Sequence, residues 1–599
     1  MPLALHGSMM ADLLTTGRSR RCATSECGCC RSPGSNIGWG WWRKPTRPSE
    51  RRGEHMTSSA TGHATPSQTG RAARRGALLG GLAAVAAVLA ACESSPVPDD
   101  SFLTRAERTD YRETSSHADV LDFLQRAAAS SPSVHYTTFG YTNEGRALPL
   151  AVVGDVADAS PASVRASGRT VVYLQGNIHA GEVCGKEALQ MLLRDIMAGR
   201  HDAWRESMVL LIGPIYNADG NERVTLTNRG RQYGPFGGMG QRPNAQGYDL
   251  NRDHMKLDSP EARSVARLFG EYDPHVAVDL HTTNGTQHAY HLTYSPPLHP
   301  NTPAGIDDFL RDGLLPHVTG EIRDKHGWEY YYYGNAFARG GGEPGWYTFD
   351  HRPRFNNNYL GLRNRIAILS EAYSYASFEE RVLATLYFVE EILDYVHEHA
   401  NEVRSIVAEA DAATVVGDSL ALRAVPERSP APVDILMGAT IEEAHPLTGS
   451  PLLLRADTQY VAPMYEYGTF APTLRERVPE AYLVPADLQD ILTRLAAHGV
   501  ALEPAGTTPL DVEEFRIDSV QTAEQPFQGR NEQTLFGSYE TARVTPESGD
   551  VLARVDQPLG RLLFSLLEPQ SDDGFANWGF LANRLSAGEA YPVLRVPGG

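Results

Sequence analysis

Four continuous apolar runs dominate the hydrophobic pattern of the chain up to about residue 405. They are TVVYLQ (170–175), MVLLIGPI (208–215), HVAVDL (275–280) and RIAILS (365–370). Apolar runs of this length, without alternating polar positions, are typical of strands that are buried on both faces of a sheet. We therefore predict that these runs form central strands.

Helical spacing of apolar residues occurs between and around these runs. The segments 114–131, 186–197 and 378–399 each place apolar residues about 3.6 positions apart. Strands that alternate with helices are typical of an α/β domain in which helices cover a sheet. We assign this α/β domain to residues 106–405.

The pattern changes after about residue 410, where short β-like runs are separated by Pro and Gly. Examples are LLLRA (452–456), VEEFRIDSV (512–520) and YPVLRV (591–596). One helix is expected at 486–498, with Gly499 as its C-terminal stop. These features predict a smaller, mostly-β domain over residues 406–599.

The N-terminal part of the chain is typical of a targeting segment rather than of a fold. Arg74 and Arg75 precede the apolar stretch 76–91, which is short for a membrane-spanning helix and ends in Leu-Ala-Ala followed by Cys92. This ending resembles a bacterial lipobox, which implies cleavage before Cys92 and a lipid on its thiol. An uncleaved membrane anchor is the alternative.

The segment boundaries follow from this interpretation. Residues 56–92 form the signal peptide, 93–105 a linker, and 1–55 an N-terminal extension that is unstructured or lies before the true start at Met56. The arginine pair resembles a twin-arginine export signal. We expect an exported protein that is held in the cell envelope by a lipid anchor.

Charge and cysteine content narrow the possible partners. The full chain has a formal net charge of −19, and removal of residues 1–91, with 12 basic and four acidic residues, leaves 42 basic and 69 acidic residues and a charge of −27. Such a surface repels nucleic acid and anionic lipid headgroups. After cleavage only Cys92 and Cys184 remain, and a lipid on Cys92 excludes an internal disulfide.

Candidate metal ligands lie just after two of the apolar runs. His179 and Glu182 follow the run 170–175, and His281 follows the run 275–280 directly. A catalytic zinc ion takes three protein ligands and keeps one position for water. Three other histidines compete for the third position: His254, His288 and His291. By itself the His-x-x-Glu pair is a weak signal, because a surface pair after a strand has the same pattern.

The stretch GQRPNAQGYDLNRD (240–253) carries a second group of functional candidates. Arg242, Asn251 and Arg252 bring two guanidinium groups and an amide into one short segment. A planar guanidinium binds a carboxylate in a bidentate way, which suits a substrate with a free C-terminus. A solvated loop with a salt bridge is the alternative.

Taken together, these motifs resemble the zinc carboxypeptidases of the M14 family. The resemblance extends over about residues 110–400 and rests on GNIHAGEVCGKEA (176–188), NADG (217–220) and the segment 242–252, which is similar to the regulatory N/E branch. It implies a mixed central sheet flanked by helices and one zinc ion per chain. The implied ligands are His179, Glu182 and His281.

The resemblance also implies roles for the other candidates. Arg242 would contact the transition-state oxyanion, Asn251 and Arg252 would bind the terminal carboxylate, and Glu371, next to the run 365–370, would be the general base. The family has a mobile tyrosine just before a Gly-Gly segment, and this tyrosine has no clear counterpart here. The residue nearest to that position, before the glycines 340–342, is Phe337. Three tyrosines remain candidates, and side-chain specificity stays open: Tyr333, Tyr347 and Tyr359.

The leading hypothesis is an exported zinc metallocarboxypeptidase whose partner is a peptide with a free C-terminal carboxylate. An N-acyl amino acid deacylase of the aspartoacylase type is the nearest rival, and a cell-wall peptide amidase is another. A catalytically dead peptide-binding lipoprotein is a third alternative. Chelator-sensitive hydrolysis would exclude the last of these.

Overall fold

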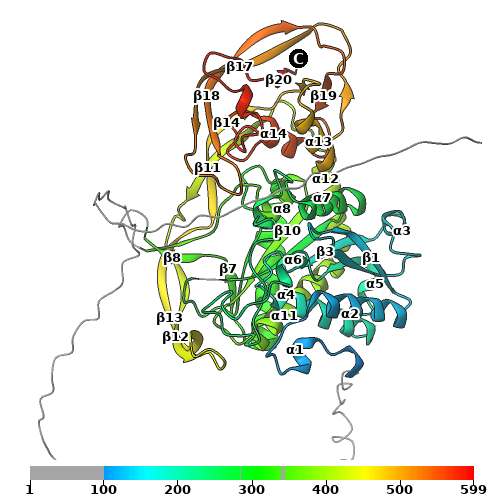
Figure 1. The fold of residues 1–599 in the computed structure, drawn as a ribbon, viewed down its shortest axis with the longest axis vertical. Helices are drawn as coiled ribbons and strands as arrows, with labels where there is room; N and C mark the ends of the chain where they lie inside the picture. Colours follow the sequence, from blue (N-terminus) through cyan, green and yellow to red (C-terminus); the bar gives the residue numbers. More distant parts are fainter. Residues whose placement is uncertain (1–99, 284, 339–343, 599) are drawn as a thin grey trace, which may run out of the picture. The chain divides into compact units, whose positions relative to one another are not determined.

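The computed structural model describes residues 100–283, 285–338 and 344–598. These residues all belong to one compact unit (Figure 1). The predictions for residues 1–92, including the signal peptide and the lipid on Cys92, lie outside the described residues. Within the described ranges, none of the helices has both the length and the apolar character needed to cross a bilayer.

An eight-stranded sheet forms the centre of the α/β part. Its strand order is β1 (Val134–Tyr141), β2 (Ala147–Val153), β4 (Met208–Gly213), β3 (Thr170–Gly176), β5 (Val276–Thr282), β10 (Ile366–Ala372), β6 (Leu292–Ser295) and β7 (Tyr330–Tyr332). The four strands β4, β3, β5 and β10 run parallel. The pairs β1–β2, β2–β4 and β10–β6 are antiparallel, and the edge strand β7 runs parallel to β6. The predicted mixed sheet is therefore confirmed.

The four apolar runs form the four parallel strands, with different ends from those predicted. Strand β5 continues through His281 to Thr282, and β10 continues through Glu371 to Ala372. Both residues thus lie within strands rather than after them. The parallel register pairs Glu371 with His281 directly. These two candidate residues are adjacent because β5 and β10 are parallel neighbours whose ends meet at one edge of the sheet.

Helices cover both faces of the sheet. One core cluster joins one face to α2 (His117–Ser130), α4 (Cys184–Met197), α9 (Leu315–His326) and α11 (Phe378–Glu398), and the other face packs against α3 (Pro161–Ala166), α7 (Pro260–Tyr272) and α10 (Asn356–Leu362). Helix α2 begins at His117 because Ser116 and Asp119 form a capping box. The predicted helices are thus present, with ends that differ by up to three residues.

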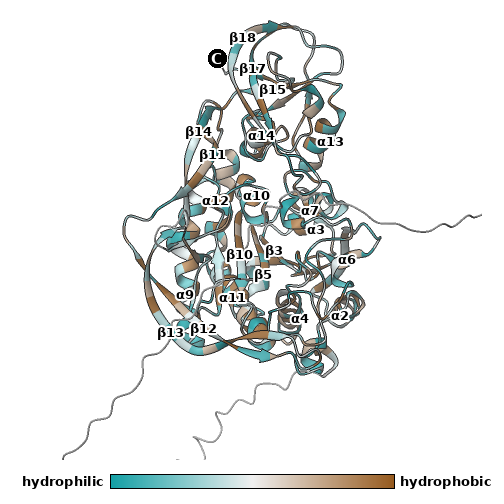
Figure 2. Ribbon diagram, turned by 60° about the vertical axis from the view of Figure 1, so that its left-hand side comes forward, coloured by the Kyte–Doolittle hydropathy of each residue, from teal (hydrophilic) through white to brown (hydrophobic). Residues whose placement is uncertain are grey.

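The C-terminal region is rich in long β-strands. Its elements are α12 (Ala400–Ala412), β11 (Ser419–Glu427), β12 (Val433–Ala444), β13 (Pro451–Tyr467), β14 (Thr469–Arg477), β15 (Ala481–Val484), α13 (Gln489–His498), β16 (Glu503–Pro504), β17 (Leu510–Thr522), β18 (Gln533–Val544), β19 (Val551–Arg554), α14 (Gly560–Leu567) and β20 (Leu594–Val596). Hydrophilic and hydrophobic segments mix along β12 and β13, as Figure 2 shows. The predicted boundary at residue 405 falls inside helix α12.

The C-terminal region is joined to the α/β part by strand pairing and by a shared core. Strand β13 pairs in parallel with β9 (Gly345–Tyr347), which in turn pairs with β8 (Asn335–Phe337). A single hydrophobic cluster contains residues from the central sheet, from α7 and α10, and from α13 and α14. Segments of the C-terminal region therefore pack directly against the α/β part.

Candidate active site

The first two candidate ligands lie in the tight loop between β3 and α4. The Glu182 amide donates to the His179 carbonyl at 2.9 Å, which closes a turn just before α4 begins at Cys184. Gly181 has no space for a side chain, because a Cβ there would lie 2.9 Å from both Arg229 Cγ and the Gly240 carbonyl. The glycine lets the loop approach its neighbours closely and fixes both ligands at the sheet edge.

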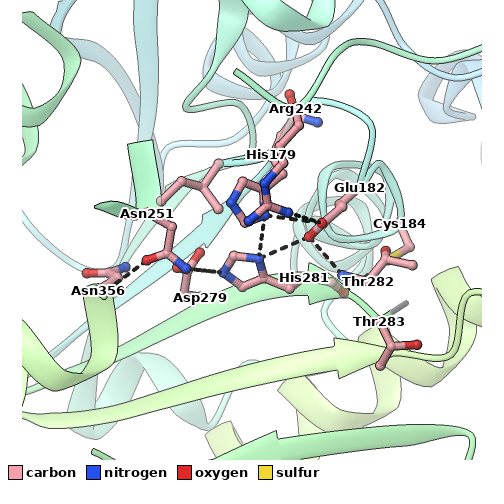
Figure 3. Close-up of polar contacts among 12 residues, drawn as sticks. His179, Glu182, Cys184, Arg242, Asn251, Asp279, His281, Thr282, Thr283 and Asn356 are labelled. Atoms are coloured by element: carbon pink, nitrogen blue, oxygen red, sulfur yellow. Dashed lines mark hydrogen bonds and ion pairs between the residues drawn. The ribbon is translucent and has the colours of Figure 1, made fainter. Parts of the chain in front are cut away.

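His179, Glu182 and His281 point toward one another (Figure 3). Glu182 Oε1 lies 3.1 Å from His179 Nδ1, Glu182 Oε2 lies 3.0 Å from His281 Nδ1, and the two Nδ1 atoms are 3.2 Å apart. The residues are 4%, 2% and 1% exposed, and their ligand atoms all lie within 4.8 Å of one another. Two imidazoles and one carboxylate are the donor set that suits a catalytic zinc ion.

The outer nitrogens of both histidines are bound by carboxylates that the sequence analysis missed. Asp249 Oδ1 is 3.0 Å from His179 Nε2, and Asp279 Oδ2 is 2.9 Å from His281 Nε2. Carboxylates in this position orient ligand imidazoles and fix their tautomer, here with Nδ1 toward the cluster. The Asp-x-His spacing was a usable signal for Asp279, because residues two apart in a strand share a face.

Arg229 is the other functional candidate that sequence reasoning missed. Its Nη1 donates to Glu182 Oε1 at 2.8 Å, and its Nη2 donates to the carbonyls of Thr282 and Thr283 at 2.8 and 2.6 Å. It thereby ties the first ligand loop to the end of β5. Burial opposes ionisation, but the interactions with His179 and Arg229 hold the pKa of Glu182 well below its usual range.

A cavity of about 170 Å³ lies beside this cluster, and Glu371 is one of the residues that line it. The Oε2 atom of Glu371 is buried and has no hydrogen-bond partner in the described part of the chain. Burial raises the pKa of Glu371 to about 7, although His281 lowers it. A carboxylate with such a pKa and a free oxygen is suited to accept a proton near neutral pH.

The cationic candidates border the same cavity. Arg242 Nε and Nη2 bind Asp249 Oδ2 at 3.0 and 2.9 Å, which leaves Nη1 3.5 Å from Glu182 Oε1. Arg252 stacks on Phe355 at 3.9 Å and donates to the Asn251 carbonyl at 2.7 Å. Among the described residues, no carboxylate forms an ion pair with the Arg252 guanidinium.

The structure distinguishes the three tyrosine candidates. Tyr333 lines the cavity, whereas Tyr347 stacks on Tyr467 at 4.0 Å and the hydroxyl of Tyr359 lies 2.8 Å from His498 Nδ1. The competing histidines are not part of the metal-ligand cluster: His254, His288 and His291. Specificity could not be decided from the sequence, because Tyr347 lies in β9, which pairs with the distant strand β13, and Tyr359 contacts the distant His498.

The fold and site define a metal-dependent hydrolase class with a His-Glu-His centre. Residues 120–302 match the family model described as zinc carboxypeptidase, Peptidase_M14. This match covers all three candidate ligands and ends before Glu371. The chain is a zinc carboxypeptidase hydrolase, and its residues 120–302 are similar to the M14 family.

Similar proteins carry related names. Carboxypeptidase 2 of Trichophyton tonsurans is 25% identical over 79% of this chain and 85% of the relative, and that of Trichophyton rubrum is 24% identical with the same coverage. A metallo-carboxypeptidase from Burkholderia cenocepacia is 17% identical, with a TM-score of 0.36, over 47% of this chain and 69% of that structure. Carboxypeptidase A from Helicoverpa armigera is 15% identical, with a TM-score of 0.36, over 48% and 75%.

Proposed function

We propose that this chain removes the C-terminal residue from peptides that carry a free terminal carboxylate. The observation that carries this proposal is the position of Arg252 on the cavity beside the metal-ligand cluster. Its guanidinium lacks a carboxylate partner among the residues described. A substrate carboxylate supplies the missing bidentate acceptor. The Asn251 side-chain NH₂ group, on the same cavity, assists this contact.

The metal ion and the general base have different roles in the proposed hydrolysis. His179, Glu182 and His281 would hold the zinc ion, which would lower the pKa of a bound water to about 7 and polarise the scissile carbonyl. Glu371 accepts the proton of the attacking water through its unpartnered Oε2, and it then donates this proton to the leaving amine. Its raised pKa of about 7 suits both transfers.

Arg242 and Tyr333 complete the proposed site. The Nη1 atom of Arg242, 3.5 Å from Glu182 Oε1, is available to donate to the carbonyl oxygen when that oxygen becomes anionic. Tyr333 lines the cavity and takes the role of the family tyrosine. The segment 242–252 supports assignment to the regulatory N/E branch, which it resembles.

The location of the enzyme is a further part of this proposal. The apolar stretch 76–91 followed by Cys92 supports export and a lipid anchor at the cell envelope. Cys92→Ser should release the protein into a soluble fraction or leave it as the precursor. Mature protein whose sequence still begins at residue 56 would contradict processing at Cys92.

A comparison of paired substrates tests the proposed activity. A peptide with a free C-terminus and its C-terminal amide are incubated with the zinc-loaded protein, with and without a chelator. We expect chelator-sensitive release of the last residue from the free peptide only. If the amide were hydrolysed equally well, the activity would be that of an endopeptidase or amidase rather than a carboxypeptidase. Turnover of N-acyl amino acids alone would indicate the deacylase.

A further inference from the structure

The loop between β17 and β18 of the C-terminal region, residues 523–532, reaches the segment that carries the second group of site residues. Gln528 lies at the tip of this loop, and its Oε1 accepts a hydrogen bond from the Asp249 backbone amide at 2.8 Å. Asp249 is the carboxylate that contacts His179 and Arg242. A side chain 279 positions further along the chain is therefore in direct contact with a residue of the active site.

The tip of this loop is a tight turn. The Phe527 amide donates to the Arg530 carbonyl at 2.8 Å, and the Arg530 amide donates to the Phe527 carbonyl at 3.0 Å. The two residues between them, Gln528 and Gly529, have φ values of +50° and +80°. A type I′ turn requires positive φ at both central positions, which asparagine, aspartate or glycine adopts more readily than glutamine. The unfavourable conformation of Gln528 indicates a role for its side chain.

Contacts on the C-terminal side of the tip hold this turn against the catalytic segment. A Cβ on Gly529 would lie 3.2 Å from Tyr248 Cε1, so the turn packs closely on the residue before Asp249. Arg530 binds both oxygens of Asp258 through Nε and Nη2, each at 2.8 Å. A bidentate ion pair of this kind fixes orientation as well as distance. The tip is thus held in a defined position beside Asp249.

Asp249 transmits this contact to the site. The residue is 9% exposed, so its amide has little access to water and needs an acceptor from the protein. Its Oδ1 lies 3.0 Å from His179 Nε2, and its Oδ2 accepts from Arg242 Nε at 3.0 Å. Both contacts depend on the position of the Asp249 main chain, because one short side chain serves both partners. An acceptor on the amide therefore fixes His179 and Arg242 together.

We propose that Gln528 is a positioning residue of the active site, which acts through the Asp249 amide. It aligns the metal ligand His179 and the guanidinium of Arg242 through the two carboxylate oxygens of Asp249. The effect on zinc affinity depends on the metal-ligand cluster alone, whereas the effect on turnover rests on the role proposed above for Arg242. The C-terminal region thus completes the catalytic site in addition to packing against the α/β part.

Substitutions of Gln528 separate the hydrogen bond from the turn. Gln528→Gly removes the acceptor but suits a positive φ, so the stability of the full chain should persist. The zinc dissociation constant should rise by about tenfold, at the low end of the effects of outer contacts on metal ligands. At saturating zinc, kcat should fall by about tenfold or more, because a small misplacement of a catalytic group is costly. KM should change little, since Arg252 is held by its stacking on Phe355.

Two further variants and a control complete the experiment. Gln528→Glu keeps an acceptor and should restore both zinc affinity and kcat. Gln525→Gly, at an exposed position of the same loop, is the matched control. Competition with a chromogenic chelator gives the zinc dissociation constant, and chemical denaturation gives the stability. If Gln528→Gly folds poorly, Gln528→Asn replaces it, because asparagine also tolerates positive φ and its side chain is one methylene shorter.

Zinc affinity decides the proposal separately from the proposed activity. A variant without the acceptor that binds zinc as tightly as Gln525→Gly would overturn the proposal, whatever its turnover. A Gln528→Glu protein that binds zinc as weakly as Gln528→Gly would also overturn it, because the acceptor would then not matter. If wild type lacks carboxypeptidase turnover, the proposed activity fails, and the zinc affinities of the same variants still decide the role of Gln528.

Discussion

The catalytic region and the C-terminal region each remove a glutamate carboxylate from solvent, but they surround it differently. Glu568 in the C-terminal region is fully buried, and its oxygens accept from the Tyr482 hydroxyl at 2.6 Å, the Tyr539 hydroxyl at 2.9 Å and Arg595 Nε at 2.8 Å. Glu371 faces a cavity, and its Oε2 has no partner among the residues that the structure describes.

The arginines of the two regions show the same contrast. Arg595 is enclosed by Glu568 and lies 3.3 Å from Glu476, whereas Arg252 has no carboxylate ion-pair partner in the described chain and borders the active-site cavity. A network in which every buried charge has a partner stabilises the fold. A network with unpartnered polar atoms beside a cavity can bind a ligand. The difference predicts opposite effects of mutation in the two regions.

The largest effect is expected for the metal ligands. His179→Ala or His281→Ala should reduce zinc from about one ion per chain to near zero and abolish hydrolysis, because each removes one of three ligands. Metal analysis of purified protein measures this loss. His317→Ala, an exposed histidine on α9, should keep full zinc. Full zinc content in both ligand variants would disprove the ligand assignment.

Glu371→Gln should lower kcat by ~10²–10⁴-fold, because an amide cannot accept the proton of the attacking water. Zinc content and thermal stability should persist. Since burial raises the pKa of Glu371 to about 7, wild-type activity should fall as the pH drops and the base becomes protonated. Bound zinc, as a nearby positive charge, should move this acidic fall in activity toward lower pH. Steady-state kinetics over a pH range test the role, and near wild-type turnover in the variant would exclude it.

Arg595→Ala should act on stability rather than on chemistry. Removal of one partner of a buried ion pair costs about 3–5 kcal/mol, because Glu568 keeps an uncompensated charge. Chemical denaturation should report this loss, while zinc content and kcat below the melting temperature stay unchanged. The exposed pair of Arg543 and Asp511 offers the control, since Arg543→Ala should cost at most about 1 kcal/mol. A stable Arg595→Ala protein would contradict the comparison.

Arg252→Ala should raise KM by roughly tenfold or more and lower kcat less, since the carboxylate contact exists in the ground and transition states alike. The same variant should process a C-terminal amide no worse than wild type does. Kinetics on both substrates measure the difference. An unchanged KM for the free peptide would remove Arg252 from carboxylate binding.

The last prediction concerns Arg229, which contacts the candidate ligand Glu182 without being a ligand itself. Arg229→Ala should weaken zinc affinity by about 10–100-fold, because the outer contacts of metal ligands carry effects of this size. Competition with a chromogenic chelator gives the dissociation constant. Arg231→Ala, an exposed neighbour, is the control. Equal zinc affinity in the two variants would show that the contact with Glu182 is dispensable.

Much of the fold could be predicted because its signals are local. The four apolar runs identified the parallel strands, and helical spacing identified α2, α4 and α11 to within a few residues. The ends of β5 and β10 could not be predicted, since His281 and Glu371 are polar residues that continue a strand beyond the apolar run. Polar residues at an active site break the burial pattern on which such predictions rest.

The sequence by itself determined the spacing of His179 and Glu182, the central strands and the motif from Arg242 to Arg252, because each depends on residues close together in the chain. Only the tertiary structure decided that Glu371 pairs with His281, that Arg229 holds Glu182, and that Gln528 from the β17–β18 loop contacts the Asp249 amide. These contacts join residues 47 to more than 100 positions apart. Strand register and packing of the whole chain bring them together, and no local pattern encodes that choice.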